Sequence, residues 1–289
     1  MKLKAKQKKI LLLAAVIVVG LIAFFKWQNN SISINEIVFK NDIVPESFNG
    51  YKILQISDLH NKEFGSKQNK ILSKMEKINP DIIVITGDLI DSNNTNIDIA
   101  MELINGAINI APIYYVSGNH EAWSGSYNDL KSKLENSGVV VLDNRKIQVF
   151  NDNDSIDIIG LSDTAFIESD WLEYGGNTKT KNLLTTLAED STNFKILLSH
   201  RPELFDIYSN SNVNLVFSGH AHGGQFRLPF IGGLIAPNQG FFPKLTEGIH
   251  TTNNTSMIIS RGLGNSIIPV RIFNRPELIV VKLSHYKDR

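Results

Sequence analysis

The segment that decides the fold is Leu54-Gln55-Ile56-Ser57-Asp58-Leu59-His60. Its apolar residues are typical of a buried strand, and a small hydroxyl residue ends the run before two potential metal ligands, Asp58 and His60. Side chains two positions apart on an extended chain point to the same side. Asp58 and His60 can therefore reach one ion, although such a pair alone occurs by chance in many proteins.

The same pattern occurs four more times along the chain. An apolar run ends in Ser or Thr at residues 82–86, 113–117, 196–199 and 215–218. The carboxyl ends of parallel strands form the edge of an α/β sheet where ligands bind. The pattern therefore predicts that polar side chains after each run gather at one edge. These side chains are Asp88, Asn119 with His120, His200, and His220 with His222.

The segments that follow each of the first three runs have apolar residues at helical spacing, and we expect helices there. Ser66 and Thr95 are the expected N-caps of the first two, and Ser126 precedes the third, which ends at Gly138. Strands that alternate with helices are typical of βαβ units and a parallel sheet.

The second half of the chain has a different pattern. Residues 139–160 contain short apolar runs joined by Asn and Asp turns, which predicts an antiparallel meander in a second sheet. An irregular loop with Trp171 and Tyr174 is expected at 162–176, and a helix at 181–188. Residues 226–250 are rich in Gly, Pro and Phe, and we expect no core strand or helix from them. Closing strands are predicted at 257–260 and 278–283.

Size and charge limit the classes of protein. The chain has 289 residues, 42% of them hydrophobic and 20% charged, which suits one fairly large globular domain or two small ones. Lys and Arg number 29, as do Asp and Glu, and the body has no basic stripe, so nucleic-acid binding is not expected. The absence of cysteine excludes disulfides and thiolate metal sites, and the composition fixes no oligomeric state.

The N-terminal residues predict a membrane anchor. Residues 10–25 are 16 consecutive apolar or glycine residues after a start that contains five lysines. As a helix they would span roughly 24 Å, with Lys26 able to snorkel and Trp27 suited to the interface. A cleaved signal peptide is the alternative, but no small-residue cleavage site precedes the polar residues. We therefore expect a single-pass anchor and linker at 1–30 and a catalytic body at 31–289, on the outer face because the lysines hold the N-terminus in the cytoplasm.

The side chains expected at the sheet edge offer nitrogen and oxygen ligands to a metal. Carboxylate, amide oxygen and imidazole suit Mn²⁺, with Fe or Zn²⁺ as alternatives, whereas so much imidazole disfavours Mg²⁺ and Ca²⁺. Seven ligands suit two divalent ions that share a carboxylate, because both of its oxygens can be used, and Asp88 is the expected shared ligand. The seven candidates are Asp58, His60, Asp88, Asn119, His200, His220 and His222.

Charge then predicts the reaction. Two divalent ions would bring four positive charges against the two negative charges of Asp58 and Asp88. The surplus suits an anionic substrate and a bridging hydroxide that attacks phosphorus in line, since a two-metal centre activates water and neutralises charge on a phosphoryl transition state. Hydrolysis of a phosphate ester fits best, and amide hydrolysis is left open by ligand type alone.

His120 is the candidate catalytic acid. It directly follows the expected ligand Asn119, so its side chain should point elsewhere and could protonate the leaving oxygen or stabilise it as imidazolium. Asp91, three residues after Asp88, could hold the other ring nitrogen of His120, or only cap the next segment. Glu121 is expected to be a local structural carboxylate.

Together these residues resemble the calcineurin-like metallophosphoesterases. The matching blocks, in the order of that family, are Asp58-x-His60, Gly87-Asp88-x-x-Asp91, Gly118-Asn119-His120-Glu121, an isolated His200 and Gly219-His220-Ala221-His222. The resemblance covers roughly residues 50–225 and implies an α/β fold, a four-layer αββα sandwich of two mixed sheets flanked by helices, with two metals at the strand ends. It also implies that His120 is the acid. The implied ligand sets are Asp58, His60, Asp88 and His222 for one metal, and Asp88, Asn119, His200 and His220 for the other.

Further features are similar to the bacterial membrane-anchored branch, which includes proteins like UDP-2,3-diacylglucosamine hydrolases. They are the N-terminal anchor, Gly223-Gly224-Gln225 and Arg261-Gly262-Leu263-Gly264. This similarity implies the bacterial cytoplasmic membrane and a lipid-linked or nucleotide-linked phosphoester substrate, either a monoester or a diester. The alternatives are a small soluble phosphate ester, a phosphoprotein, and a metal-stabilised envelope binding protein without turnover.

Two groups of residues have open roles. Phe226, Phe230, Phe241 and Phe242 could form an apolar lip for a lipid tail, or their loop could fold onto its own domain. The arginines could bind phosphate or pair with acidic residues. They are Arg201, Arg261 and Arg271.

Overall fold

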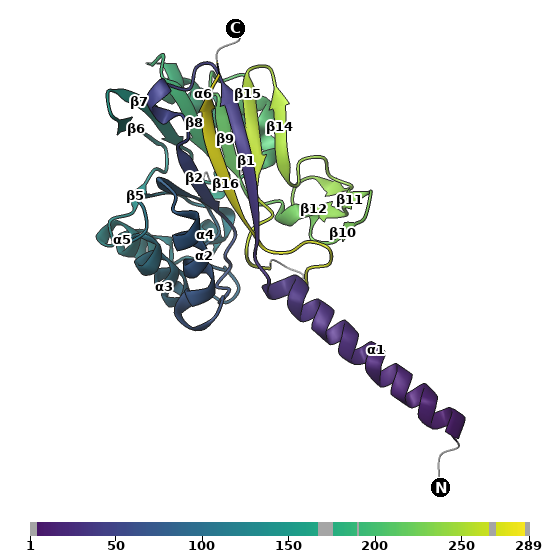
Figure 1. The fold of residues 1–289 in the computed structure, drawn as a ribbon. Helices are drawn as coiled ribbons and strands as arrows, with labels where there is room; N and C mark the ends of the chain where they lie inside the picture. Colours follow the sequence, from purple (N-terminus) through teal and green to yellow (C-terminus); the bar gives the residue numbers. More distant parts are fainter. Residues whose placement is uncertain (1–4, 167–175, 190, 266–269, 287–289) are drawn as a thin grey trace.

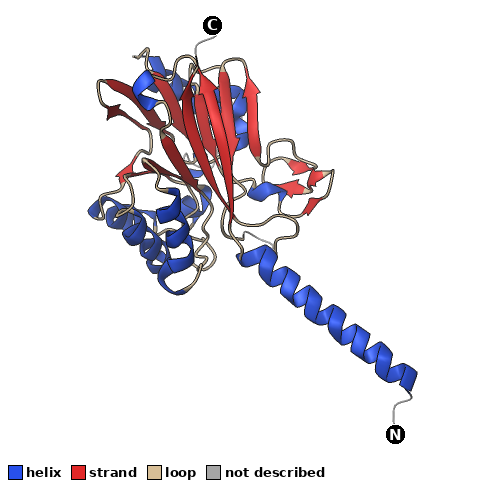
Figure 2. Cartoon of the chain, in the orientation of Figure 1, coloured by secondary structure: helices blue, strands red, loops and turns tan. Residues whose placement is uncertain are grey.

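The computed structural model describes residues 5–166, 176–189, 191–265 and 270–286 of the chain. A long N-terminal helix leads into a body in which two six-stranded sheets are flanked by helices (Figure 1). Figure 2 shows the strands of both sheets stacked at the centre, with most of the body's helices on the outer faces.

The first sheet combines strands from both ends of the chain. Its order is β1-β16-β2-β3-β4-β5, in which β16 runs antiparallel to β2 and the other neighbours are parallel. The strands are β1 Ser33–Asn41, β2 Lys52–Ile56, β3 Ile82–Thr86, β4 Ile113–Val116, β5 Val140–Val141 and β16 Glu277–His285.

The second sheet has the order β14-β15-β9-β8-β7-β6. Its four inner strands run parallel, and the two edge strands, β14 and β6, run antiparallel to their neighbours. The strands are β6 Arg145–Asn151, β7 Asp154–Gly160, β8 Phe194–Leu198, β9 Leu215–Ser218, β14 Gly248–Thr252 and β15 Thr255–Ile259.

Three apolar cores separate the four layers, and the alternation of side chains along the strands creates them. In β3, Ile83 and Ile85 pack against the helices of the first layer, whereas Ile82 and Val84 pack between the two sheets. Such strands are buried on both faces and are therefore apolar throughout. Leu197 of β8 similarly faces the outer helices of the second sheet. The predicted four-layer αββα sandwich of two mixed sheets is thus confirmed.

The helices lie at the predicted places, with different caps. The side chain of Asn96 accepts the N–H of Asp98 at 3.1 Å and caps α3, so the expected cap Thr95 is wrong. Ser66 opens a short 3-10 turn before α2 instead of capping it. The helices of the body are α2 Asn69–Ile78, α3 Ile97–Ala107, α4 Asn119–Trp123, α5 Tyr127–Asn136, α6 Gly176–Glu189 and α7 Phe205–Tyr208.

Three predictions about the second half need correction or lie outside the description. Val140–Val141 pairs parallel with β4 in the first sheet, because the chain completes one more βα unit before the antiparallel pair β6 and β7 begins. Residues 248–252 form the edge strand β14. The sequence did not predict this strand, because its residues are mostly exposed and include no apolar run. Trp171 and Tyr174 lie outside the described residues.

Helix α1, Ala5–Asn30, is the one helix among the described residues that is long and apolar enough to span a membrane. It extends past the apolar run through the residues expected to be a polar linker, because its last turn is fixed to the body. Gln28 is buried, the backbone N–H of Arg271 donates to Asn29 Oδ1 at 2.8 Å, and the Arg275 guanidinium lies 4.8 Å from the centre of the Trp27 ring.

Candidate metal centre

The strand ends that the sequence singles out meet between the two sheets. Gln55 Nε2 donates to the Ser218 carbonyl at 2.9 Å, and His200 Nδ1 donates to the Thr86 carbonyl at 2.7 Å, so these hydrogen bonds join the first sheet to the second. The strands involved are β2, β3, β4, β8 and β9. All seven predicted metal ligands are buried at this junction.

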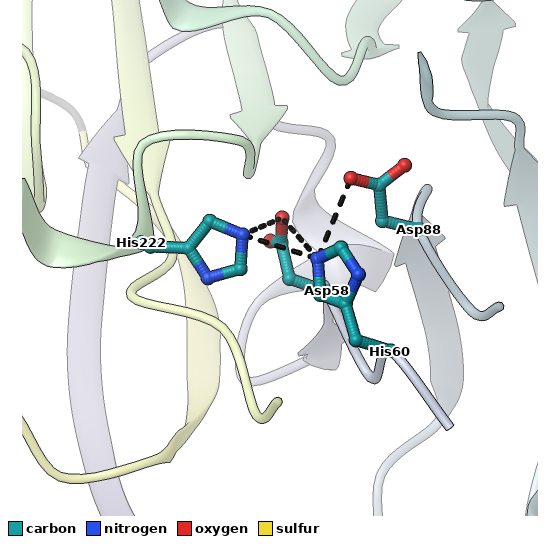
Figure 3. Close-up of side chains that lie close together, drawn as sticks. All are labelled: Asp58, His60, Asp88 and His222. Carbon is teal, nitrogen blue, oxygen red and sulfur yellow. Dashed lines mark hydrogen bonds and ion pairs between the residues drawn. The ribbon is translucent and has the colours of Figure 1, made fainter. Parts of the chain in front are cut away.

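Asp58, His60, Asp88 and His222 form a first group, whose ligand atoms all lie within 4.8 Å of one another (Figure 3). His60 Nε2 lies 3.1 Å from His222 Nε2 and 3.5 Å from Asp88 Oδ2. His222 Nε2 lies 3.3 Å from Asp58 Oδ1. Two imidazole nitrogens that face each other compete for one proton, and a shared cation satisfies both of them.

A second group surrounds His200 Nε2. This atom lies 3.1 Å from Asp88 Oδ2, 3.1 Å from Asn119 Oδ1 and 3.2 Å from His220 Nδ1. Burial disfavours the imidazolium, but the charge and hydrogen bond of Asp88 outweigh it and raise the pKa of His200 to about 10. A divalent ion that binds here would therefore displace a proton.

Asp88 belongs to both groups through a single oxygen. Its Oδ2 faces both His60 and His200, whereas Oδ1 accepts the backbone N–H of His120 at 2.9 Å. The expectation that both oxygens face the groups is therefore wrong, because the backbone occupies one of them. Burial favours the neutral acid, but the charge and hydrogen bond of His200 outweigh it and hold the pKa of Asp88 well below its ordinary value.

The predicted ligands converge through turns and not through strand alternation. Strand β2 ends at Ile56, and Asp58 and His60 beyond it have left-handed backbone, so the expected extended geometry is wrong there. This conformation costs a non-glycine residue roughly 1–3 kcal/mol and is concentrated at functional sites. Five of the seven candidates adopt it, with φ between 46° and 63°: Asp58, His60, Asp88, His220 and His222.

Two glycines leave room for the carboxylates. A Cβ on Gly219 would overlap Ser57 Oγ and the Asp58 carboxylate, and a Cβ on Gly118 would overlap Asp88 Oδ1. The matching blocks therefore need glycine at these positions for close approach of the backbone and not for turn geometry alone.

Glu121 fixes the backbone that carries the shared ligand. Its buried carboxylate accepts the N–H groups of Gly118 at 2.7 Å, Asp88 at 2.8 Å and Ile90 at 3.2 Å. Burial and the charge of Asp88 raise the pKa of Glu121 to about 7. These contacts confirm the predicted structural role of Glu121, since it holds the ends of β3 and β4 together.

His120 lies beside the two groups with a defined ring orientation. The backbone N–H of Ser92 donates to His120 Nδ1 at 3.0 Å, so the proton of a neutral ring is on Nε2. Burial lowers the pKa of His120, against the opposing charge of Asp88. The ring is therefore neutral at physiological pH and presents an N–H donor to the adjoining cavity. The sequence did not identify Ser92, because the contact is made by its backbone.

Asp91 lies between two histidines. Its Oδ2 is 3.4 Å from His60 Nδ1 and 3.7 Å from His120 Nδ1. The hydrogen bond with His60 is the main reason that the pKa of Asp91 falls to about 2. A carboxylate on Nδ1 directs Nε2 of the same ring toward a metal. The predicted contact with His120 is the longer of the two, and the role of Asp91 is still a prediction.

His220 and His222 are held in the neutral form that binds metals. Burial, followed by neighbouring positive charge, places the pKa of both well below the ordinary value. Asn274 Nδ2 donates to the His222 carbonyl at 2.7 Å, and the Asn238 side-chain nitrogen lies 3.3 Å from His220 Nε2. Neither asparagine belongs to a matching block, so no pattern in the sequence selects them.

A cavity of about 340 Å³ adjoins both groups. Trp123, which is more than half exposed, stands at it beside His120, with ring centres 5.6 Å apart. The residues that line the cavity are Asp88, Ser92, Asn93, Asn119, His120, Trp123, His220, His222 and Pro237.

The three arginines with open roles are engaged elsewhere. Arg201 forms a buried pair with Asp163, at 2.8 and 2.9 Å. Arg261 pairs with Glu277 at 2.7 Å. Arg271 is fully buried and donates to backbone carbonyls, including that of Arg261 at 2.9 Å. Pairing with acids is therefore what the structure shows for the first two.

The donors fit divalent metal ions. Seven oxygen and nitrogen donors converge without an arginine or lysine among them, several histidine nitrogens face each other, and one carboxylate oxygen lies between the two groups. Such a buried set, with more acceptors than protons, is satisfied by cations.

Comparisons with known proteins agree with this chemistry. The family model described as calcineurin-like phosphoesterase matches residues 51–224. An uncharacterized metallophosphoesterase, YkuE of Bacillus subtilis, is 31% identical over 89% of this chain and 87% of its own length. A transmembrane protein with metallophosphoesterase domain from Danio rerio is 30% identical over 83% of this chain and 54% of its own length.

Among solved structures, a dimetal phosphatase from Danio rerio has a TM-score of 0.48 and 14% identity, over 74% of this chain and 88% of that one. The family model covers more than half of the chain, and the sequence blocks it spans are those that build the two groups of ligands. The matching family is one of enzymes that hydrolyse phosphoesters. This chain belongs to the calcineurin-like phosphoesterase family.

Proposed function

We propose that this chain is a two-metal phosphoester hydrolase that acts on a substrate at or near a membrane. The observation that carries the proposal is the position of Asp88 Oδ2, 3.5 Å from His60 Nε2 and 3.1 Å from His200 Nε2. A carboxylate oxygen between two sets of ligands is the arrangement that a pair of bridged cations requires.

The two groups of ligand atoms define the proposed sites. Oxygen and imidazole donors suit Mn²⁺, with Fe or Zn²⁺ as alternatives. When bound, the two ions would supply an activated water and neutralise charge on the phosphoryl group. One ion would be held by Asp58, His60, Asp88 and His222, and the other by Asp88, Asn119, His200 and His220.

His120 is the proposed group that assists departure of the leaving oxygen. Ser92 occupies its Nδ1, so Nε2–H is the donor that the ring can offer to a phosphoester in the cavity. Because burial lowers the pKa of His120, the ring is neutral, and its Nε2–H would stabilise the leaving oxygen as a hydrogen-bond donor. Asp91 would orient His60 through Nδ1, which it approaches more closely than His120.

The proposed setting is the bacterial cytoplasmic membrane. Helix α1 contains the apolar run at residues 10–25 and extends away from the body (Figure 1), and relatives include proteins named transmembrane. Residues 1–30 would be the anchor and linker and 31–289 the catalytic body, on the outer face because the lysines precede the apolar run. A lipid-linked or nucleotide-linked phosphoester is the substrate class that suits this place.

Metal-dependent turnover of the full chain tests the proposal. The chain is purified in detergent, stripped of metal, reconstituted with Mn²⁺, Zn²⁺ or Fe²⁺, and assayed on p-nitrophenyl phosphate and bis(p-nitrophenyl) phosphate. Hydrolysis of at least one ester that depends on added metal is expected. Protein that binds two ions and leaves every phosphoester intact would contradict the proposal and support a binding protein without turnover.

A further inference from the structure

Residues 226–243, here called the lobe, expose large apolar side chains. The lobe consists of two small hairpins, β10 Arg227–Leu228 with β11 Gly232–Gly233, and β12 Ile235–Ala236 with β13 Gly240–Phe241. Phe230 at the tip of the first hairpin is fully exposed, and Ile231 beside it is more than half exposed. Contiguous apolar groups of this size on a surface mark a contact with another apolar phase.

The lobe lies on the side of the body from which α1 extends (Figure 1). Phe273, half exposed, packs on Phe24 of α1 with ring centres 5.7 Å apart. Phe24 belongs to the apolar run of α1, so Phe273 lies at the depth where that run ends. Phe230, Ile231 and Phe273 line one groove of about 460 Å³. Through Phe273, this groove connects the tip of the first hairpin to the end of the apolar run of α1.

Charged side chains surround the same end of α1. A cavity of about 720 Å³ lies between α1 and α2 and is lined by lysines. Ammonium groups at the end of a spanning helix lie at the level of lipid phosphates, which attract them. The lysines are Lys26, Lys70, Lys74 and Lys77.

We propose that the β10–β11 hairpin enters the same bilayer as α1, with Phe230 and Ile231 among the acyl chains and these lysines at the headgroups. The inference rests on the proposed membrane location of α1. The occupant of the apolar tip is lipid, because the tip is continuous through Phe273 with the helix that spans the membrane.

The second hairpin of the lobe connects this contact to the metal centre. Pro237, between β12 and β13, lines the catalytic cavity, and Asn238 lies 3.3 Å from His220 Nε2. A lobe in the bilayer therefore holds the cavity at the headgroup level. The chemical class of substrate that fits is an amphiphile whose phosphoester lies at the membrane surface.

Site-directed fluorescence in the full chain tests the contact. The chain has no cysteine, so Phe230→Cys, Val18→Cys and Phe150→Cys each give one labelling site. Each variant carries an NBD fluorophore and is reconstituted, one chain per nanodisc, in phosphatidylcholine with phosphatidylglycerol, with or without spin-labelled lipid. Val18 reports α1, and Phe150 is an exposed phenylalanine on β6 at the far edge of the second sheet.

We expect spin-labelled lipid to quench the probe at position 230 several-fold more than the probe at 150, and as strongly as the probe at 18. Quenching at 18 with position 230 like 150 would overturn the second contact and leave the anchor intact. Quenching at neither 18 nor 230 would overturn both. A blue-shifted probe at 230 that lipid does not quench would mean burial against protein and would also overturn the inference. None of these readouts depends on hydrolysis.

Discussion

The carboxyl edge of the two sheets and the lobe differ in the polarity of their side chains and in how far those side chains are buried. At the edge, polar side chains are buried, converge within hydrogen-bond distance and lie on left-handed backbone. In the lobe, apolar side chains are exposed on two hairpins of a few residues each. The comparison teaches that burying polar groups marks the place of chemistry, whereas exposing apolar ones marks a place of contact.

The largest effect is expected from Asp88→Asn. An amide supplies one oxygen without charge, so both groups lose their common carboxylate. We expect turnover to fall on the order of 10³-fold and bound metal to fall below one ion per chain, measured by steady-state assay and elemental analysis. Asp129→Asn, at an exposed carboxylate on α5, is the matched control and should change neither. Full activity of Asp88→Asn would break the account of the edge.

His120→Gln separates chemistry from metal binding. We expect about 10²–10⁴-fold slower turnover, because the imidazole Nε2–H that would stabilise the leaving oxygen is lost, while both ions stay bound. His250→Gln is the control, since His250 lies on β14, away from the groups, and contacts the Glu247 carbonyl. Equal losses of metal and turnover would make His120 a ligand and remove its proposed catalytic role.

Asp91→Asn distinguishes the two histidines beside this carboxylate. If Asp91 orients His60, metal affinity should fall about 10–100-fold and turnover should recover at high metal concentration. Titration of the metal-free variant with Mn²⁺, followed by activity, measures both quantities. Unchanged metal affinity with slow turnover would instead assign Asp91 to His120.

The pH dependence of kcat/KM has a predicted sign. Burial lowers the pKa of His120 below its ordinary value of about 6.5, and bound cations would push it in the same direction. The neutral form therefore exists at pH 7 and above, and activity should rise from acid pH to a plateau. Profiles at saturating metal check this. A decline between about pH 6 and 8 in the wild type that disappears in His120→Gln would show that the imidazolium is the active form.

The lobe should give the smallest effect on soluble substrates. Phe230→Ser with Ile231→Ser touches exposed side chains, so stability should change by less than about 0.5 kcal/mol for each change and turnover of p-nitrophenyl esters should stay unchanged. Turnover of a vesicle-embedded phospholipid should fall several-fold. Equal turnover of that lipid by the variant and by Phe150→Ser would remove the lobe from substrate access.

The sequence predicted which side chains gather at the carboxyl edge of the sheets, because Asp, Asn and His directly after an apolar run are recognisable as potential metal ligands. Asp58, Asp88 and His200 follow short apolar runs that are typical of buried strands. Because these strands run parallel to their neighbours, their carboxyl ends lie at the same edge. It could not predict how the ligands converge. The left-handed turns at Asp58 and His60, and the single free oxygen of Asp88, depend on backbone hydrogen bonds that residue types do not encode.

Two contacts at the site, one edge strand and the exposure of the lobe could not be predicted from the sequence either. Ser92 acts through its backbone N–H, and Asn274 reaches His222 from 52 residues away, so neither has a local pattern. Strand β14 lies at a sheet edge, where one face needs no apolar residue. The phenylalanines of the lobe were compatible with burial or exposure, and the three-dimensional arrangement decides between them.

The most direct test of the central claim is the number of metal ions that the wild-type chain holds. Full-length protein is stripped of metal, equilibrated with Mn²⁺, freed of excess ion and assayed by elemental analysis against a protein concentration from amino-acid analysis. Two ions per chain are predicted, because two groups of ligands share Asp88. One ion per chain or fewer, under conditions that saturate activity, would contradict the account.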